Sequence, residues 1–275
     1  MRGSLERARA EASVVAVLVP AFDEAQCVGQ IVREFVALKR EFSDRHLRVE
    51  LHVIDNGSTD ATAEVAASEM RSLENCHLHH VALRGKGNAV RWGFANIHAD
   101  VYALVDCDLT YSLNDIPALA ALVTSGTCEM AIGDRLTRGA YRRAHGPDFR
   151  WAANHLISWV IASRLQQRRV DALSGLRVLD GRLARRMNLR ESGFALETEL
   201  MFEAARLGSR VQSLPAAYRG RPSGSESKLV TGIDGPPILW TLLRRLYAHR
   251  APSRRESFAR VAVGAHLDSV SSSER

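Results

Sequence analysis

The sequence VVAVLVPAFDE at residues 14–24 decides the fold, because it joins a short β-branched run to a polar end. Continuous apolar runs of this length are typical of buried strands, and we expect a strand at residues 14–20. Similar strand-like stretches with polar ends recur along the first half of the chain, and the segments between them have apolar residues at helical spacing. The further strands are expected at residues 49–55 (VELHVID), 77–83 and 101–106 (VYALVD), and the helices at residues 24–40, 59–72 and 86–97. Strands that alternate with helices favour an α/β fold with a mainly parallel central sheet flanked by helices.

The second half of the chain is less regular. We expect a strand at residues 129–133 and helices at residues 150–164, 178–190 and 196–207. The last of these stops at Gly208, a residue type that commonly ends helices. Residues 220–224 contain Gly, Pro and Ser and predict a loop. We expect an N-terminal tail at residues 1–13, a single domain at residues 14–250 with its halves at 14–116 and 117–250, and a C-terminal tail at residues 251–275.

Composition excludes several protein classes. The 275 residues are 46% hydrophobic and 25% charged, as in globular proteins, so disordered and fibrous classes are excluded. The 37 Lys and Arg against 31 Asp and Glu give a net charge of +6, but no nucleic-acid recognition motif accompanies it, so a nucleic-acid partner is not expected. Four cysteines lack CxxC spacing and residues 1–13 lack an apolar leader, which predicts a cytoplasmic protein.

Membrane contact is a separate question. We find no apolar run of the roughly 18 residues that a spanning helix needs, so we expect no integral membrane segment. Residues 232–250 (GIDGPPILWTLLRRLYAHR) alternate apolar residues with arginines. This segment either packs on the core as a C-terminal helix or lies on an anionic membrane, which would make the protein peripheral at the inner membrane surface.

Polar residues follow each of the first four expected strands. They are Pro20-Ala21-Phe22-Asp23-Glu24, Asp55-Asn56-Gly57-Ser58-Thr59-Asp60, Arg84-Gly85-Lys86-Gly87-Asn88 and Asp106-Cys107-Asp108. Because ligands of such sheets bind beyond the carboxyl ends of the strands, the sequence predicts a site at this edge.

Two of these ends carry recognisable chemistry. Asp106 and Asp108 are two residues apart, so their carboxylates share one face and Cys107 points to the other. Such a pair suits Mg²⁺ or Mn²⁺ held with a substrate diphosphate, whereas an isolated pair is more often solvated. Lys86 lies between two glycines, which lets the backbone approach a phosphate or simply forms a turn. Ser58 or Thr59 is the expected cap of the following helix.

In this order the motifs resemble those of family 2 glycosyltransferases, most closely the dolichyl- or polyprenyl-phosphate sugar synthases. The resemblance spans residues 14 to 246 and implies the GT-A fold, a Rossmann-like nucleotide-sugar-binding fold. The later matching stretches are Gly133-Asp134-Arg135, Ser174-Gly175-Leu176-Arg177, Phe194-Ala195-Leu196-Glu197-Thr198-Glu199-Leu200 and Arg221-Pro222-Ser223-Gly224-Ser225-Glu226-Ser227-Lys228-Leu229.

The resemblance also implies residue roles. Asp106 and Asp108 would hold Mg²⁺ or Mn²⁺ with the sugar diphosphate, and Glu197 would lie near the transferred sugar. The nucleotide would contact Pro20, Ala21, Phe22, Glu24, Asp55 and Lys86. The acceptor side, or a loop that closes over the diphosphate, would contain Arg135, Arg221, Ser227 and Lys228. Four positions depart from the family pattern, namely Asp23, Asn56, Cys107 and Thr110.

The chemistry favours a phosphate acceptor. An alcohol acceptor needs a general base, for which Glu197 or Asp134 is available, whereas a phosphate is already an anion and needs cations. The leading hypothesis is therefore a metal-dependent inverting glycosyltransferase that moves a sugar from a UDP- or GDP-sugar to a polyprenyl phosphate. Alternatives are an isomerase or mutase acting on the nucleotide sugar, transfer to a small soluble metabolite, or nucleotide-sugar binding without turnover.

Overall fold

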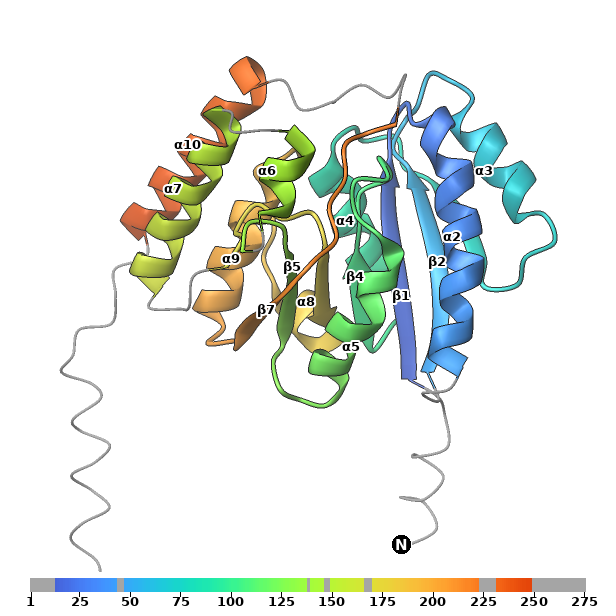
Figure 1. Ribbon diagram of the computed structural model, residues 1–275, viewed down its shortest axis with the longest axis horizontal. Helices are drawn as coiled ribbons and strands as arrows, with labels where there is room; N and C mark the ends of the chain where they lie inside the picture. Colours follow the sequence, from blue (N-terminus) through green and yellow to red (C-terminus); the bar gives the residue numbers. More distant parts are fainter. Residues whose placement is uncertain are drawn as a thin grey trace, which may run out of the picture.

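A twisted sheet forms the centre of the molecule (Figure 1). The computed structural model describes residues 13–43, 47–137, 139–145, 149–165, 170–222 and 231–248. In this part of the chain seven strands pair in the order β3-β2-β1-β4-β6-β5-β7. All neighbours are parallel except β6, which runs antiparallel to both β4 and β5. The strands are β1 Ser13–Ala21, β2 Leu47–Asp55, β3 Cys76–His80, β4 Val101–Leu104, β5 Met130–Asp134, β6 Arg177–Asp180 and β7 Val211–Pro215.

Helices cover both faces of the sheet. They are α2 Ala25–Ser43, α3 Thr62–Met70, α4 Lys86–Asn96, η1 Leu113–Asp115, α5 Ile116–Thr124, α6 Ala140–His145, α7 Phe149–Leu165, α8 Gly181–Arg186, α9 Leu196–Arg206 and α10 Thr231–Ala248. The helices predicted from residues 24–40, 59–72, 86–97, 150–164 and 196–207 are all present, with ends shifted by a few residues.

The central strand β1 shows why the chain forms three layers. Val15, Val17 and Val19 pack with α2, α3 and α5 on one face, and Ala16 and Leu18 pack with α4 and α9 on the other. Because side chains alternate across a strand, a strand that is buried on both faces must be apolar throughout. This explains the continuous run VVAVLV.

One prediction for the second half of the chain is wrong, and some of its elements were not predicted. Residues 178–190 do not form one helix, because Arg177–Asp180 is the strand β6 and the following helix covers only Gly181–Arg186. Val178 and Leu179 are fully buried between β4 and β5. A short, wholly buried apolar run has the same periodicity in a strand and in a helix, so pattern alone misassigned it. The strand β7 and the helix α5 carried no prediction.

The helix α10 packs on the protein by one face. Ile238 and Leu242 are buried, whereas Leu239, Trp240 and Leu243 on the other face are exposed. Arg244 and Arg245 are paired with acidic side chains of the 191–203 region, so these two arginines support packing rather than lipid binding. No helix in the described ranges is long and apolar enough to cross a membrane.

Candidate active site

The site lies where the chain reverses its direction across the sheet. From β1 the chain runs to β2 and β3 on one side, and it returns as β4 on the other side of β1. Such switch points leave a crevice beyond the carboxyl ends of the strands. The segments that follow β1, β2 and β4 meet at this edge, as the sequence predicted.

Two cations bridge four carboxylates at this edge. Lys86 Nζ lies 2.5 Å from Asp106 Oδ1 and 2.6 Å from Glu197 Oε1. The guanidinium of Arg221 lies 2.7 Å from Asp108 Oδ2 and 3.1 Å from Glu24 Oε1. The structure therefore brings together six of the residues predicted for the site. The four carboxylates and two cations together carry a formal charge of −2, which one divalent cation would neutralise.

Burial sets the protonation of this cluster. Burial alone would lower the pKa of Lys86, but the carboxylates of Asp106 and Glu197 raise it above its ordinary value, so the amine stays charged. Burial and the charge of Asp106 raise the pKa of Asp108, while Arg221 and hydrogen bonds from Thr110 oppose that rise. Burial also raises the pKa of Glu24, with Arg221 opposing. A raised carboxyl pKa means that burial disfavours the ionised form of Asp108 and of Glu24. Added positive charge would therefore stabilise both carboxylates.

The Asp106 and Asp108 side chains are held by their surroundings. Asp108 Oδ1 accepts hydrogen bonds from Thr110 N at 3.0 Å and from Thr110 Oγ1 at 2.6 Å. Asp106 rests against Gly175, where an added Cβ would lie 2.1 Å from Asp106 Oδ2. Cys107, between them, is buried in the hydrophobic core. Thr110, one of the departures from the family pattern, therefore orients the Asp108 carboxylate, and Gly175 leaves space for Asp106.

The predicted nucleotide side is built from the ends of β1 and β2. Asp55 Oδ1 accepts a hydrogen bond from Ser58 N at 3.2 Å, and Asp55 Oδ2 lies 3.2 Å from His80 Nδ1. The Phe22 ring lies 4.6 Å from the Arg84 guanidinium. Pro20 is half-buried and Ala21 is buried. Contact of these residues with a nucleotide stays a prediction.

The loops after β1 and β2 are tied together by side chains. Asp23 Oδ1 accepts a hydrogen bond from Thr59 N at 2.6 Å, which an Asn oxygen at this position would also accept. The predicted cap by Ser58 or Thr59 is wrong, because α3 begins at Thr62. The N-cap position is Ala61, which makes no side-chain capping hydrogen bond. The Asp60 side chain closes the turn before the helix, since its Oδ1 accepts from Thr62 N at 3.0 Å.

The glycines around Lys86 serve packing. A Cβ on Gly85 or Gly87 would lie about 2 Å from the backbone oxygens of Ser192 or Glu191. Gly87 N also donates to Ser192 O at 2.8 Å. The predicted alternative, in which the glycines let the backbone approach a phosphate, has no support in these contacts. From this loop, the Lys86 side chain reaches the carboxylate cluster.

Asn56 is a site residue whose role only the structure revealed. Its Nδ2 donates to Val81 O at 3.3 Å and to Leu83 O, and its Oδ1 accepts from Gly85 N. A carboxylate could not donate these bonds. Asn56 therefore fixes the strand end that carries Lys86, and its departure from the family's Asp was the signal in the sequence.

Arg135 and Asp134 are engaged in internal networks. Arg135 Nε lies 2.7 Å from Asp171 Oδ2, and its guanidinium lies 5.2 Å from the ring centroid of Tyr141 and 5.4 Å from that of Tyr218. Asp134 accepts hydrogen bonds from the backbone of residues 136 and 137 and from the hydroxyl of residue 137. These contacts position the loop after β5, and a catalytic role for either residue stays a prediction. Ser227 and Lys228 lie outside the described residues.

Comparisons with known proteins agree with this geometry. Residues 16–193 match Glycosyl transferase family 2. The chain is 31% identical over 235 residues to glycosyltransferase AglJ of Haloferax volcanii, covering 84% of this chain and 71% of that protein. It is 28% identical over 218 residues to an undecaprenyl-phosphate mannosyltransferase of Micrococcus luteus, covering 72% of this chain and 85% of that one.

The fold is shared with solved structures. Glucosyl-3-phosphoglycerate synthase of Mycobacterium tuberculosis, solved with Mn²⁺, UDP-glucose and phosphoglyceric acid, superimposes with a TM-score of 0.62 at 21% identity, covering 90% of this chain and 84% of that one. The fold is thus the GT-A fold that the resemblance implied. By its sequence match and its fold, this chain belongs to glycosyl transferase family 2.

Proposed function

We propose that the chain is a metal-dependent, inverting glycosyltransferase that moves a sugar from a UDP- or GDP-sugar to a polyprenyl phosphate. The observation that carries the proposal is the cluster of four carboxylates and two cations at the switch point. Breaking a sugar–phosphate bond builds negative charge on the leaving nucleoside diphosphate. A site that offers Lys86, Arg221 and a place for a divalent cation can stabilise that charge.

Asp106 and Asp108 would hold Mg²⁺ or Mn²⁺. Carboxylate oxygens are the ligands that these ions prefer, and the formal charge of −2 on the cluster fits a divalent ion. When bound, the ion would neutralise charge on the diphosphate. Thr110 and Gly175 keep the two carboxylates in position.

Arg221 would bind the diphosphate, and Lys86 would hold the carboxylates beside it. Arg221 precedes the segment 223–230 and reaches both Glu24 after β1 and Asp108 after β4. With a metal ion on the carboxylates, its guanidinium would turn to the diphosphate, for which its planar fork of donors is suited. Lys86 would keep Asp106 and Glu197 charged and ordered.

A phosphate acceptor is supported by the state of the candidate bases. Glu197 is held in an ion pair with Lys86 at 2.6 Å, and Asp134 accepts three hydrogen bonds from its own loop. A carboxylate committed in this way is poorly placed to take a proton from an alcohol. A phosphate oxygen attacks the anomeric carbon without a base, from the side opposite the leaving diphosphate, which inverts the configuration.

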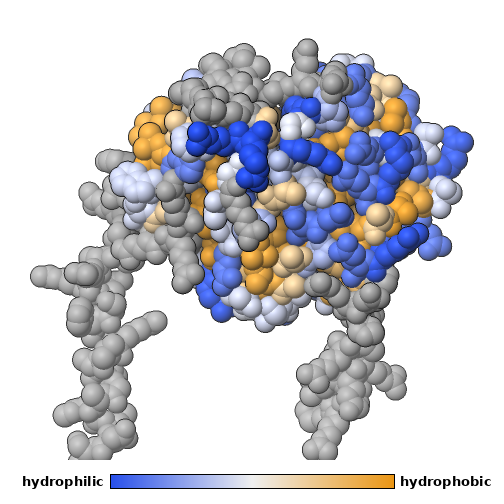
Figure 2. Space-filling view, in the orientation of Figure 1, coloured by the Kyte–Doolittle hydropathy of each residue, from blue (hydrophilic) through white to orange (hydrophobic). Residues whose placement is uncertain are grey.

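A lipid chain on that phosphate is supported by an apolar surface. Leu156 and Trp159 of α7, and Leu239, Trp240 and Leu243 of α10, are each more than half exposed. Both helices pack against α9, and Figure 2 shows an apolar area at the end of the molecule that they occupy in Figure 1. We call these five residues the apolar surface. Exposed tryptophans among apolar side chains suit the interface of a bilayer, and the exposed Arg142 and Arg143 of α6 add positive charge to the protein surface that anionic lipids attract.

Product analysis tests the reaction. The purified chain with Mn²⁺ is incubated with a panel of UDP- and GDP-sugars, with and without undecaprenyl phosphate, and products are identified by chromatography and mass spectrometry. We expect nucleoside diphosphate and lipid-linked sugar only when donor and acceptor are both present. Asp108→Asn should abolish turnover, and Asp100→Asn, at the opposite end of β4, should not. A nucleotide sugar that changes at constant mass without acceptor would refute transfer and favour an isomerase.

The acceptor's lipid part is tested separately. We expect the chain to sediment with vesicles that contain phosphatidylglycerol, and Trp159→Ala combined with Trp240→Ala to weaken that binding at least about tenfold. Val36→Ala on α2 is the matched control, since Val36 is also an exposed apolar side chain. Equal vesicle binding by the wild type, the double tryptophan variant and Val36→Ala would show that the apolar surface does not bind lipid.

A small phosphorylated molecule is the second acceptor to test. The neighbour of the same fold is a glucosyl-3-phosphoglycerate synthase, and a soluble phosphate would need the same cations. Transfer to 3-phosphoglycerate but not to undecaprenyl phosphate would keep the donor half of the proposal and replace the lipid half.

A further inference from the structure

A second cluster of metal-binding side chains lies away from the active site. Glu50 and His52 belong to β2, and His77 belongs to the edge strand β3, directly opposite His52 in the parallel register. Glu50 precedes Asp55, at the active edge, by five residues, which is about 16 Å along a strand. The two groups therefore belong to separate parts of the sheet.

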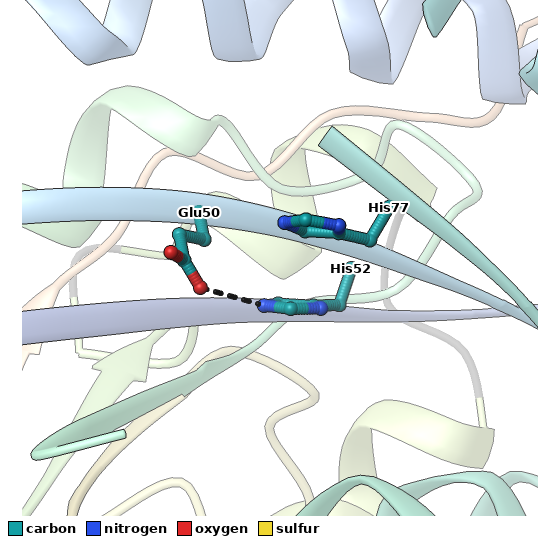
Figure 3. Close-up of side chains that lie close together, drawn as sticks. All are labelled: Glu50, His52 and His77. Atoms are coloured by element: carbon teal, nitrogen blue, oxygen red, sulfur yellow. Dashed lines mark ion pairs between the residues drawn. The ribbon is translucent and has the colours of Figure 1, made fainter. Parts of the chain in front are cut away.

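Three donor atoms of the cluster converge. One side-chain donor each from Glu50, His52 and His77 lies within 4.8 Å of the other two. Figure 3 shows the two imidazoles stacked, each with a nitrogen turned toward the Glu50 carboxylate. The ring centroids are 4.8 Å apart and the planes differ by 16°. Glu50 Oε1 is held by Arg48, and Oε2 lies 3.4 Å from His52 Nε2.

His52 is prepared as a ligand by its neighbours. The residue is only 5% exposed, and its buried Nε2 makes no hydrogen bond to any part of the chain that the structure describes. Its Nδ1 lies 3.0 Å from His79 Nε2, whose ring rests 4.8 Å from that of Trp92. When Nδ1 carries the proton and donates it to His79, the lone pair of Nε2 is directed away, toward Glu50. A second partner that fixes the tautomer in this way is typical of metal-binding histidines.

A metal ion binds the neutral imidazole, in which one ring nitrogen carries the proton and the other offers its lone pair. Because Glu50 Oε2 lies 3.4 Å from His52 Nε2, an ion bound there could accept electron pairs from both residues.

We propose that Glu50, His52 and His77 bind a zinc ion that links the edge strand β3 to β2. Two imidazoles and one carboxylate are a zinc donor set, whereas the all-oxygen group at the active edge suits Mg²⁺ or Mn²⁺. The two sites would therefore select different metals. In the described sheet β3 is an edge strand that pairs with β2 alone, and the bound ion would add a second link between these two strands.

Zinc titration of the full, tag-free chain tests the proposal. Calorimetry is done with millimolar Mg²⁺ present, so that the oxygen site is not measured. We expect one zinc ion per chain, weakened by about 100-fold in His77→Ala and in Glu50→Gln, and by about 10-fold in His79→Ala, which removes only the partner of His52. His98→Ala is the matched control, because His98 is an exposed histidine on another segment. Co²⁺ should give the absorption of a tetrahedral site in the wild type and in His98→Ala, and not in His77→Ala or Glu50→Gln.

The outcomes are decisive in both directions. His77 is exposed, so His77→Ala should retain the fold, which circular dichroism checks. Zinc should raise the melting temperature of the wild type and of His98→Ala, and leave that of His77→Ala unchanged. Absence of zinc binding by the wild type at micromolar concentration, or equal affinity in His77→Ala and Glu50→Gln, would overturn the proposal whatever the transferase assay shows.

Discussion

Replacing Gly175 by alanine tests whether the position of the Asp106 carboxylate matters for catalysis. The added Cβ would lie 2.1 Å from Asp106 Oδ2 and 2.9 Å from its Cγ, whereas ordinary contact begins at 3.4 Å. The carboxylate must therefore move by about 1.3 Å. It cannot move freely, because its other oxygen is 2.5 Å from Lys86 Nζ.

The displacement gives a magnitude. A misplacement of about 1 Å in a catalytic arrangement can cost about 100-fold, or about 2.7 kcal/mol of transition-state stabilisation. We expect kcat/KM for sugar transfer to fall by that factor, and Mn²⁺ to be needed at higher concentration, since Asp106 is a proposed ligand. Overpacking should lower the free energy of unfolding by only about 1–3 kcal/mol, so the variant should still fold.

The assay is nucleoside diphosphate release across a series of Mn²⁺ concentrations, with unfolding in urea as the check on stability. Gly193→Ala is the matched control, because a Cβ at Gly193 meets no atom within 4 Å in the described structure. Activity of Gly175→Ala within about twofold of the wild type, or an equal loss in Gly193→Ala, would refute the reasoning about Asp106.

Three further substitutions probe stability through urea unfolding. Lys86→Met should lower the free energy of unfolding by about 3–5 kcal/mol, because it leaves two carboxylates without their buried cation. A loss no larger than that of Lys39→Met, at a half-buried lysine of α2, would contradict this. Asn56→Asp should cost about 1–3 kcal/mol, because a carboxylate would face two backbone carbonyls, and unchanged stability would argue against its bridging role. Glu203→Gln should cost about 2 kcal/mol at pH 7, because it weakens hydrogen bonds from two arginines. Burial would raise the pKa of Glu203, but its hydrogen-bond partners hold that pKa below the usual 4.5. The extra stability of the wild type should therefore be complete above pH 4.5 and should disappear as the pH falls further. A constant difference in stability between the two proteins down to about pH 3 would contradict this.

Much of the active edge was predictable from local sequence. The strands at residues 14–20 and 101–106 are visible because they are nearly continuous apolar runs, and the strand at residues 49–55 is visible because it is rich in β-branched residues. The polar residues that follow these strands lie at their carboxyl ends. Asp106 and Asp108 follow β4, which ends at Leu104, so their place at this edge was predictable although the chain there is no longer extended. The same locality explains the failure at residues 178–190, where a four-residue buried strand is too short to show any period.

The sequence by itself thus determined the α/β class, the strand ends and the chemical types gathered there. Only the tertiary structure decided which side chains meet: Lys86 with Glu197, 111 positions away, and Arg221 with Glu24, 197 positions away. It alone decided that the glycines beside Lys86 pack against residues 191–192, and that histidines of β2 and β3 face one another. The physical reason is that periodicity and turn chemistry act between near neighbours in the chain, whereas such contacts depend on strand order, register and helix packing, which are settled only when the whole core is buried together.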